Sequence, residues 1–196
     1  MELLKHLKKD EMPIKEDNNK RISNQESKIF QYGQIANNAG LVLLWPFLDS
    51  LFFKLGLLEK NRFKGMEDAT LAIYILNFLA TGIRNVREHE LLIPKIMIGW
   101  DTVTVIPSNI ILTDNICNEC DHFMKTFIKH WTVLKSTSPD GLREGFLQRI
   151  AFIEKKDDGW HFKFERREAD ILLDQLPFSI SIIKLKWLQE PFIISW

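Results

Sequence analysis

Two cysteines near the middle of the chain have the spacing that most directly suggests chemistry. Cys117 and Cys120 form a C-x-x-C motif, which is followed by His122 and, further along, by His130. Structural zinc takes four ligands, usually from a second pair elsewhere, but this chain has only two cysteines. On a helix the two thiols share a face, while His122 points about 160° away from Cys120. We therefore interpret the cysteines as small apolar residues of a helix core. The alternative is a small metal- or thiol-dependent protein that uses Cys117, Cys120 and one of the two histidines.

Other polar clusters are better explained by structure than by catalysis. His89 stands between two glutamates, but the second histidine of a zinc protease motif is absent, so we expect a solvated helix start. Residues 136–141, STSPDG, have the composition of a turn and helix cap, and no G-x-S-x-G motif or phosphate-binding glycine loop occurs. We expect Arg143 and Arg149 to make ion pairs or carbonyl contacts rather than to bind an anion. The sequence predicts no catalytic residue, no cofactor and no metal.

The composition narrows the class of protein. The 196 residues are 45% hydrophobic and 27% charged, as in ordinary globular proteins. Lys plus Arg and Asp plus Glu both total 26, so no net charge is available to attract nucleic acid. Aromatic residues reach 11%, with 14 Phe and 6 Trp, which favours a large core or a protein interface. Residues 1–19 contain no apolar core of a secretion signal.

The segment Asn37–Leu58 is the most apolar part of the chain, yet it is a poor membrane span. Its uninterrupted apolar run, Ala39–Leu48, is ten residues long, whereas a membrane helix needs about 20. Asp49 would lie near the centre of any such span, where a charge is costly. We therefore expect a buried helix in which Pro46 causes a kink or begins the second half.

Helical spacing divides the apolar residues of this segment into two faces. The stripe expected to face the core consists of Leu41, Leu44, Trp45, Leu48, Phe52 and Leu55. The face predicted to bind a partner consists of Val42, Leu43, Phe47 and Phe53.

The chain as a whole predicts an α+β protein with helices first. Residues 1–34 are expected to be a flexible tail, because residues 1 to about 28 are too polar to offset the entropy of ordering. Residues 35–148 are expected to form about four to five helices, and residues 149–196 a small antiparallel sheet. Within the sheet, Asp158-Gly159 between two β-prone runs predicts a hairpin. Two further strands are expected, at residues 177–187 with a bulge and at residues 191–196.

Several blocks occur in the order found in one protein family. They read NNAGLVLLWPFL from Asn37, LNFLATG from Leu76, EHELLIPKIMIG from Glu88, HWTVLKSTSPDGLREGFLQR from His130 and WHFKFERREADILLDQLPFSISIIKLKW from Trp160. Together they resemble the tape measure proteins of extracellular contractile injection systems, the phage-tail-like particles of bacteria. The resemblance covers about Ile35 to Trp196. Two positions depart from it, with Phe178 where the family commonly has Trp and Ala151 where it commonly has Gly.

The resemblance implies a structural, non-enzymatic role in particle assembly. It implies contact with inner-tube, spike or baseplate proteins, with possible homo-oligomerisation inside the assembly. The balanced charge and the lack of a basic stripe indicate no nucleic-acid partner. The implied location is the bacterial cytoplasm during assembly and then the injection particle. A fully helical chain of this length would span only about 290 Å, at 1.5 Å per residue, and most of the chain is expected to be globular. We therefore expect the terminal module of a tape measure protein rather than the ruler itself.

Overall fold

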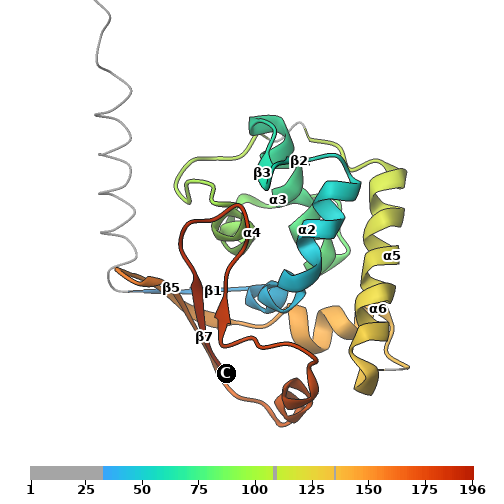
Figure 1. Ribbon diagram of the computed structural model, residues 1–196, viewed down its shortest axis with the longest axis vertical. Helices are drawn as coiled ribbons and strands as arrows, with labels where there is room; N and C mark the ends of the chain where they lie inside the picture. Colours follow the sequence, from blue (N-terminus) through green and yellow to red (C-terminus); the bar gives the residue numbers. More distant parts are fainter. Residues whose placement is uncertain (1–32, 108–109, 135) are drawn as a thin grey trace, which may run out of the picture.

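The computed structural model describes residues 33–107, 110–134 and 136–196. Figure 1 shows the helices gathered on one side of a five-stranded sheet, so the fold is α+β with the helices preceding most of the sheet, as predicted. One continuous hydrophobic core joins the two parts. The expected tail, residues 1–34, lies outside the described residues apart from its last two positions. No helix in the described part of the chain is long and apolar enough to cross a membrane.

The apolar segment begins with a buried 3₁₀ turn and continues as a helix. The turn, Ala39–Leu44, has all six residues buried, and helix α2 follows directly at Trp45–Lys54. Pro46 lies in the first turn of α2, so it begins the second half rather than causing a kink. Gly40 is required in the turn, because a Cβ atom there would lie 1.8 Å from the carbonyl oxygen of Phe146.

Helix α3, Met66–Thr81, is the central helix of the molecule. Acidic residues occupy its first turn, and Gly82 ends it with a left-handed φ of 71°. Its residues from Ala72 to Ala80 are buried on every side. A short 3₁₀ turn, Glu88–Glu90, then leads into helix α4, Leu92–Ile98, which packs against α3 and ends at Gly99.

Helix α5, Asp114–His130, is amphipathic and packs along α3. The Thr113 hydroxyl caps it by accepting a hydrogen bond from the backbone N–H of Ile116 at 3.4 Å. After a 3₁₀ turn at Thr132–Leu134, Ser138 caps the short helix α6, Pro139–Leu142. A π-helical turn, Arg143–Leu147, completes this part of the chain.

The main sheet has the order β1-β4-β5-β7-β6. Its strands are β1 Gln34–Ala36, β4 Ala151–Lys156, β5 Gly159–Phe164, β6 Ile182–Ile183 and β7 Phe192–Ser195. The predicted hairpin is confirmed, because β4 and β5 pair antiparallel around Asp157 and Asp158.

The expectation of a wholly antiparallel sheet within residues 149–196 is wrong in two respects. Strand β5 pairs with β7 in parallel, from Trp160 opposite Phe192 to Lys163 opposite Ser195. A parallel pair needs a long crossover, and residues 165–191 provide it, including the 3₁₀ helix Glu168–Gln175. The second difference is β1, which comes from the start of the module and pairs with β4.

Two local features also differ from the sequence expectation. The strand expected at residues 177–187 is reduced to β6, because residues on both sides of β6 are hydrogen-bonded to the helical part. Trp187 donates to the carbonyl of Met97 at 2.8 Å, and the carbonyl of Ser179 accepts from Trp45 at 3.3 Å. A small hairpin that was not expected from the sequence is formed by β2, Leu58–Glu59, and β3, Arg62–Phe63. Its two-residue turn has positive φ at both positions.

Candidate interaction surface

Cys117 and Cys120 lie on the buried face of α5. Both side chains are buried and free, and His122 and His130 are exposed. Burial raises the pKa of both thiols, that of Cys120 to about 12. A buried thiol with a raised pKa is a poor nucleophile and a poor metal ligand, because both roles need the thiolate. Within the described residues no three His, Cys, Asp or Glu side chains lie close enough together to hold a metal ion.

Glu88 does more than begin a solvated helix. Its carboxylate forms an ion pair with Lys95, whose side chain is almost completely buried, and accepts a hydrogen bond from the backbone N–H of Ile106 at 3.3 Å. The ammonium of Lys95 also donates to the carbonyl of Thr104 at 2.8 Å. The pair therefore fixes the loop after α4 against that helix, which is a structural task. His89 itself is exposed, as the sequence analysis expected.

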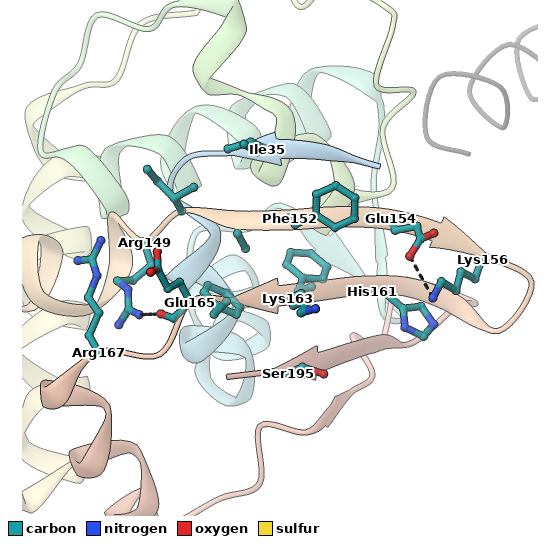
Figure 2. Close-up of a pocket in the computed structure, with 14 residues that line it drawn as sticks. Ile35, Arg149, Phe152, Glu154, Lys156, His161, Lys163, Glu165, Arg167 and Ser195 are labelled. Carbon is teal, nitrogen blue, oxygen red and sulfur yellow. Dashed lines mark hydrogen bonds and ion pairs between the residues drawn. The ribbon is translucent and has the colours of Figure 1, made fainter. Parts of the chain in front are cut away.

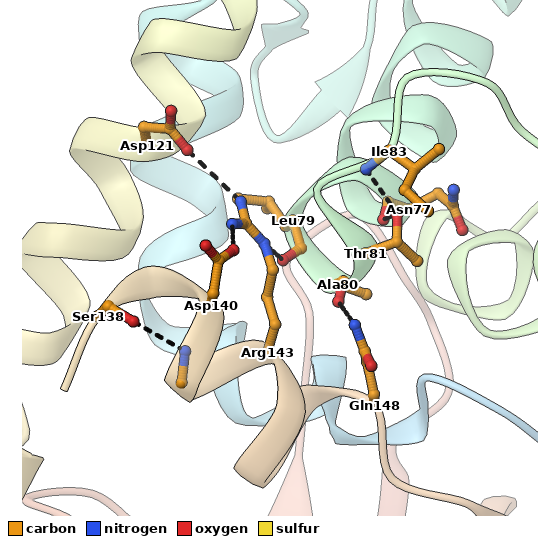
Figure 3. A network of polar contacts seen from close by, with 11 residues as sticks. Asn77, Leu79, Ala80, Thr81, Ile83, Asp121, Ser138, Asp140, Arg143 and Gln148 are labelled. Carbon is orange, nitrogen blue, oxygen red and sulfur yellow. Dashed lines mark hydrogen bonds and ion pairs between the residues drawn. The ribbon is translucent and has the colours of Figure 1, made fainter.

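Arg143 binds the C-terminal end of α3, as Figure 3 shows. Its guanidinium donates to the carbonyl of Leu79 at 3.1 Å and pairs with Asp140 at 2.7 Å and Asp121 at 3.5 Å. The side-chain amide of Gln148 donates to the carbonyl of Ala80 at 3.0 Å. The last carbonyls of a helix have no partner inside it, so these two side chains satisfy groups that would otherwise be left buried and unpaired.

Arg149 forms the most buried ion pair in the described part of the chain. Its guanidinium makes two hydrogen bonds to Asp170, one of them 3.0 Å long, and donates to the carbonyl of Glu165 at 2.7 Å. Burial alone would raise the pKa of Asp170, but the hydrogen bonds from Arg149 and from the Arg167 backbone outweigh it and lower that pKa. The expectation that both arginines make ion pairs or carbonyl contacts is confirmed.

The four residues predicted to bind a partner do not form one exposed face. Val42 and Leu43 have no exposed surface, so this expectation is wrong for them. They belong to a 3₁₀ turn that runs through the core, where every side is covered. Phe47 is half-buried and packs edge-on against Phe127 at 5.6 Å. Phe53 has 72% of its surface exposed at the end of α2.

The larger exposed apolar surface lies on the side of the sheet that faces away from the helices. We call it the outer sheet face and define it by the strand positions whose neighbours point into the core. Its members are Ile35 on β1, Phe152, Glu154 and Lys156 on β4, His161 and Lys163 on β5, Ile193 and Ser195 on β7, and Ile182 on β6, with Ile150 and Glu165 just beyond the strands. Ile35 is 73% exposed, Ile182 66% and Phe152 39%.

A groove of about 900 Å³ crosses this face. Figure 2 shows the side chains that line it. One row of directly opposed residues crosses four strands, in the order Ile35, Phe152, Lys163 and Ser195. Gly33 closes the apolar end, since its backbone lies so near Phe152 that a Cβ atom would fall 2.1 Å from the ring.

The charges on the outer sheet face leave one cation available. Glu154 pairs with Lys156 at 3.0 Å, and at the hairpin tip Asp158 pairs with His161 at 2.7 Å. Lys163 is exposed and makes no ion pair within the part of the chain that the structure describes. Of the charged side chains described as lining the groove, Arg149 is paired with Asp170 and Lys156 with Glu154. Lys163 and Arg167 then remain beside Glu165, so a net positive charge of one favours an acidic group in the occupant.

Sequence reasoning missed this face because its apolar residues are scattered. Strands β1, β4 and β6 each contribute one exposed apolar residue to it, β5 contributes polar residues, and Ile193 of β7 is half-buried, so no single segment is unusually hydrophobic. The order β1-β4-β5-β7-β6, which brings residues 35, 152 and 182 to one surface, depends on a crossover and on an N-terminal strand. The one sign of this face in the sequence is an isoleucine, Ile35, just before the polar residues Asn37 and Asn38, and this pattern alone does not predict an exposed surface.

Comparison with known proteins gave one match. The family model described as contractile injection system tape measure protein matches residues 2–196, essentially the whole chain. No curated protein and no solved structure matches the chain.

Proposed function

Because the chain belongs to the contractile injection system tape measure protein family, we propose that it acts as a non-enzymatic assembly module that binds inner-tube, spike or baseplate proteins. The family is one of structural proteins of contractile injection systems. In this proposal the chain assembles in the bacterial cytoplasm and stays in the finished particle. Residues 35–196 act as one module, which is supported by the continuous core and by the pairing of β1 with β4.

The observation that carries the proposal is the outer sheet face. Sheets with one face in water usually alternate apolar residues inward and polar residues outward. Here Ile35, Phe152 and Ile182 point outward with large exposed fractions. Ile35 and Phe152 are neighbours at one edge of this face and Ile182 lies at the other edge, with charged residues between them. Exposed apolar residues on one charged surface favour a protein interface. Phe53 is the remaining exposed member of the face predicted from sequence, and we propose it as a second contact.

Particle composition tests this function. In cells that carry the complete particle gene cluster, we expect the double substitution Ile35→Ser, Phe152→Ser to reduce the amount of this chain per tube protein in purified particles by about tenfold or more. That size follows from the cost of truncating central interface residues, about 2 kcal/mol or more. The measurement is quantitative mass spectrometry of the particles. Phe53→Ser is expected to have a smaller effect.

The matched control is Ile111→Ser, which removes an equally exposed isoleucine from a loop outside the sheet. Circular dichroism of each purified variant shows whether it folds. Normal incorporation of the folded double variant would reject the outer sheet face as the binding surface. Absence of the wild-type chain from both assembling and finished particles would reject the structural role altogether.

A further inference from the structure

The spacing of side chains on the outer sheet face indicates the kind of segment that binds there. Ile35, Phe152 and Lys163 are directly opposed across three neighbouring strands. Strands lie about 4.8 Å apart, so the three side chains mark positions at roughly 0, 5 and 10 Å along a line perpendicular to the strands. An occupant that contacts all three must present side chains at that interval.

An α-helix has this interval and an extended strand does not. Residues three or four apart on one helix face are separated by about 4.5–6 Å along the axis, at 1.5 Å per residue. Residues two apart on one face of a strand are separated by about 6.7 Å. The third side chain of such a strand would therefore lie more than about 3 Å beyond Lys163, the third residue of the row. A helix that crosses the strands therefore matches the row over two turns.

The edges of the sheet do not favour the other common mode of binding, in which a partner adds a strand. Strand β1 has three residues and β6 has two, and these are the two edges of the sheet. A strand added to so short an edge would gain few backbone hydrogen bonds. The face, with its groove of about 900 Å³, offers much more surface than either edge.

The chemistry of the row specifies the helix further. Ile35 and Phe152 call for apolar side chains, and Lys163 calls for a carboxylate, because it has no ion-pair partner in the described residues. The remaining positive charge of the groove lining points the same way, with Arg167 lying beyond Glu165, farther from the centre of the groove than Lys163 (Figure 2). Glu154, and Asp158 at the hairpin tip, already have cations beside them. Glu165 also lines the groove two residues from Lys163 and has no ion pair in the described residues, so it offsets part of the positive charge of Lys163 and Arg167.

From this geometry we propose that the outer sheet face binds an amphipathic α-helix of another particle protein. The helix lies across strands β1, β4 and β5, with apolar side chains on Ile35 and Phe152 and a carboxylate on Lys163, one helical turn beyond. This inference rests on the proposed structural function and specifies the partner of that same surface.

Photocrosslinking in assembling particles tests the inference. The photoreactive residue p-benzoylphenylalanine is placed at position 35, 152 or 182 of the full chain in cells with the complete gene cluster, and crosslinked peptides are mapped by mass spectrometry. We expect the crosslinks from positions 35 and 152 to fall on one partner chain, at residues three or four apart. Placement at Ile111 is the control and should give no crosslink to that segment.

Three outcomes overturn the inference. Crosslinked residues two apart would indicate an added strand, crosslinks to a second copy of this chain would indicate self-association, and no crosslink from any position in particles that contain the chain would indicate an empty face. Each of these is compatible with the structural role, whereas a chain absent from particles contradicts the proposed function itself. The two failures are therefore distinguishable.

Charge reversal tests the contact to Lys163. We expect Lys163→Glu to lower incorporation into particles about tenfold, and a second change in the partner helix, from the crosslinked segment's acidic residue to Lys, to restore it. Lys129→Glu, an exposed lysine on α5, is the control and should have no effect. Unchanged incorporation of Lys163→Glu, or loss that no partner substitution restores, would overturn the assignment of a carboxylate to this position.

Discussion

The 3₁₀ turn Ala39–Leu44 and the outer sheet face are both apolar, but their residues are arranged differently in the sequence and contact different surroundings. The turn is one continuous apolar block, and the fold buries it on every side. The face is built from single apolar residues on separate strands, and the fold leaves them exposed. A dense apolar block in a chain of this size is thus more useful for locating the core than for locating an interface.

Charged residues also differ between the inside of the molecule, where they are buried in ion pairs, and the outer sheet face, where they are exposed. Arg149 and Lys163 both line the groove, yet the guanidinium of Arg149 is buried with Asp170, and Lys163 is exposed. A buried ion pair mainly fixes one arrangement of the chain, here the crossover against the start of β4. An exposed cation contributes little to folding and remains available to a partner.

The largest expected effect comes from breaking the buried pair. Arg149→Met leaves the carboxylate of Asp170 buried without a counter-charge, and we expect the free energy of unfolding to fall by about 3–5 kcal/mol. Lys163→Met makes the same chemical change on the exposed side and should alter it by about 0.5 kcal/mol or less. Urea unfolding at pH 7 measures both. Similar losses in the two variants would show that the two cations do not differ in the way that their burial implies.

The second effect compares Leu43 and Phe53, the two residues of the predicted partner-binding face whose exposed fractions differ most in the folded chain. Leu43→Ala removes a fully buried side chain and should lower the free energy of unfolding by about 2–5 kcal/mol. Phe53→Ala removes a larger side chain that is mostly exposed, and it should cost about 1 kcal/mol or less. The comparison uses the denaturation midpoint and slope of each variant. A larger loss for Phe53→Ala would place that residue in the core.

Local signals made much of the fold predictable. The terminal glycines of α3 and α4, the cap at Thr113 and the hairpin around Asp158 are each determined by residues within a few positions. Propensity and capping act at that range, so one sequence is enough to find them. The burial of Cys117 and Cys120 followed from helical spacing in the same way.

Long-range pairing was not predictable by the same reasoning. The parallel pair of β5 and β7 and the addition of β1 depend on segments more than 25 residues apart. The turn Ala39–Leu44 was assigned an exposed side because helical spacing was assumed for it, whereas the backbone is 3₁₀ and passes through the core. The partner of Lys95 was missed because its burial depends on the loop that Glu88 helps to fix. The candidate surface could not be found until the order of the strands was known.

The third effect concerns pH and the same buried pair. Because folding lowers the pKa of Asp170, its carboxylate stabilises the fold above its unfolded pKa of about 3.9, and this contribution is lost as the pH falls through the folded pKa. We expect Asp170→Asn to be less stable than wild type at pH 7, and the difference to shrink as the pH falls below about 4. Urea unfolding across that range measures it. A difference that stays constant down to pH 2.5 would show that the charge of Asp170 does not contribute.

The smallest expected effect is on the outer sheet face itself, and it bears most directly on the contrast with the buried turn. Ile35→Ser and Ile182→Ser remove apolar side chains that are 73% and 66% exposed on the two edge strands. Since little of either side chain leaves water on folding, each change should alter the free energy of unfolding by about 0.5 kcal/mol or less. A loss above about 1 kcal/mol in either variant would mean that the isolated chain already covers these residues. Selection for folding alone would then explain them, whereas a negligible loss leaves their apolar character to be explained by a partner.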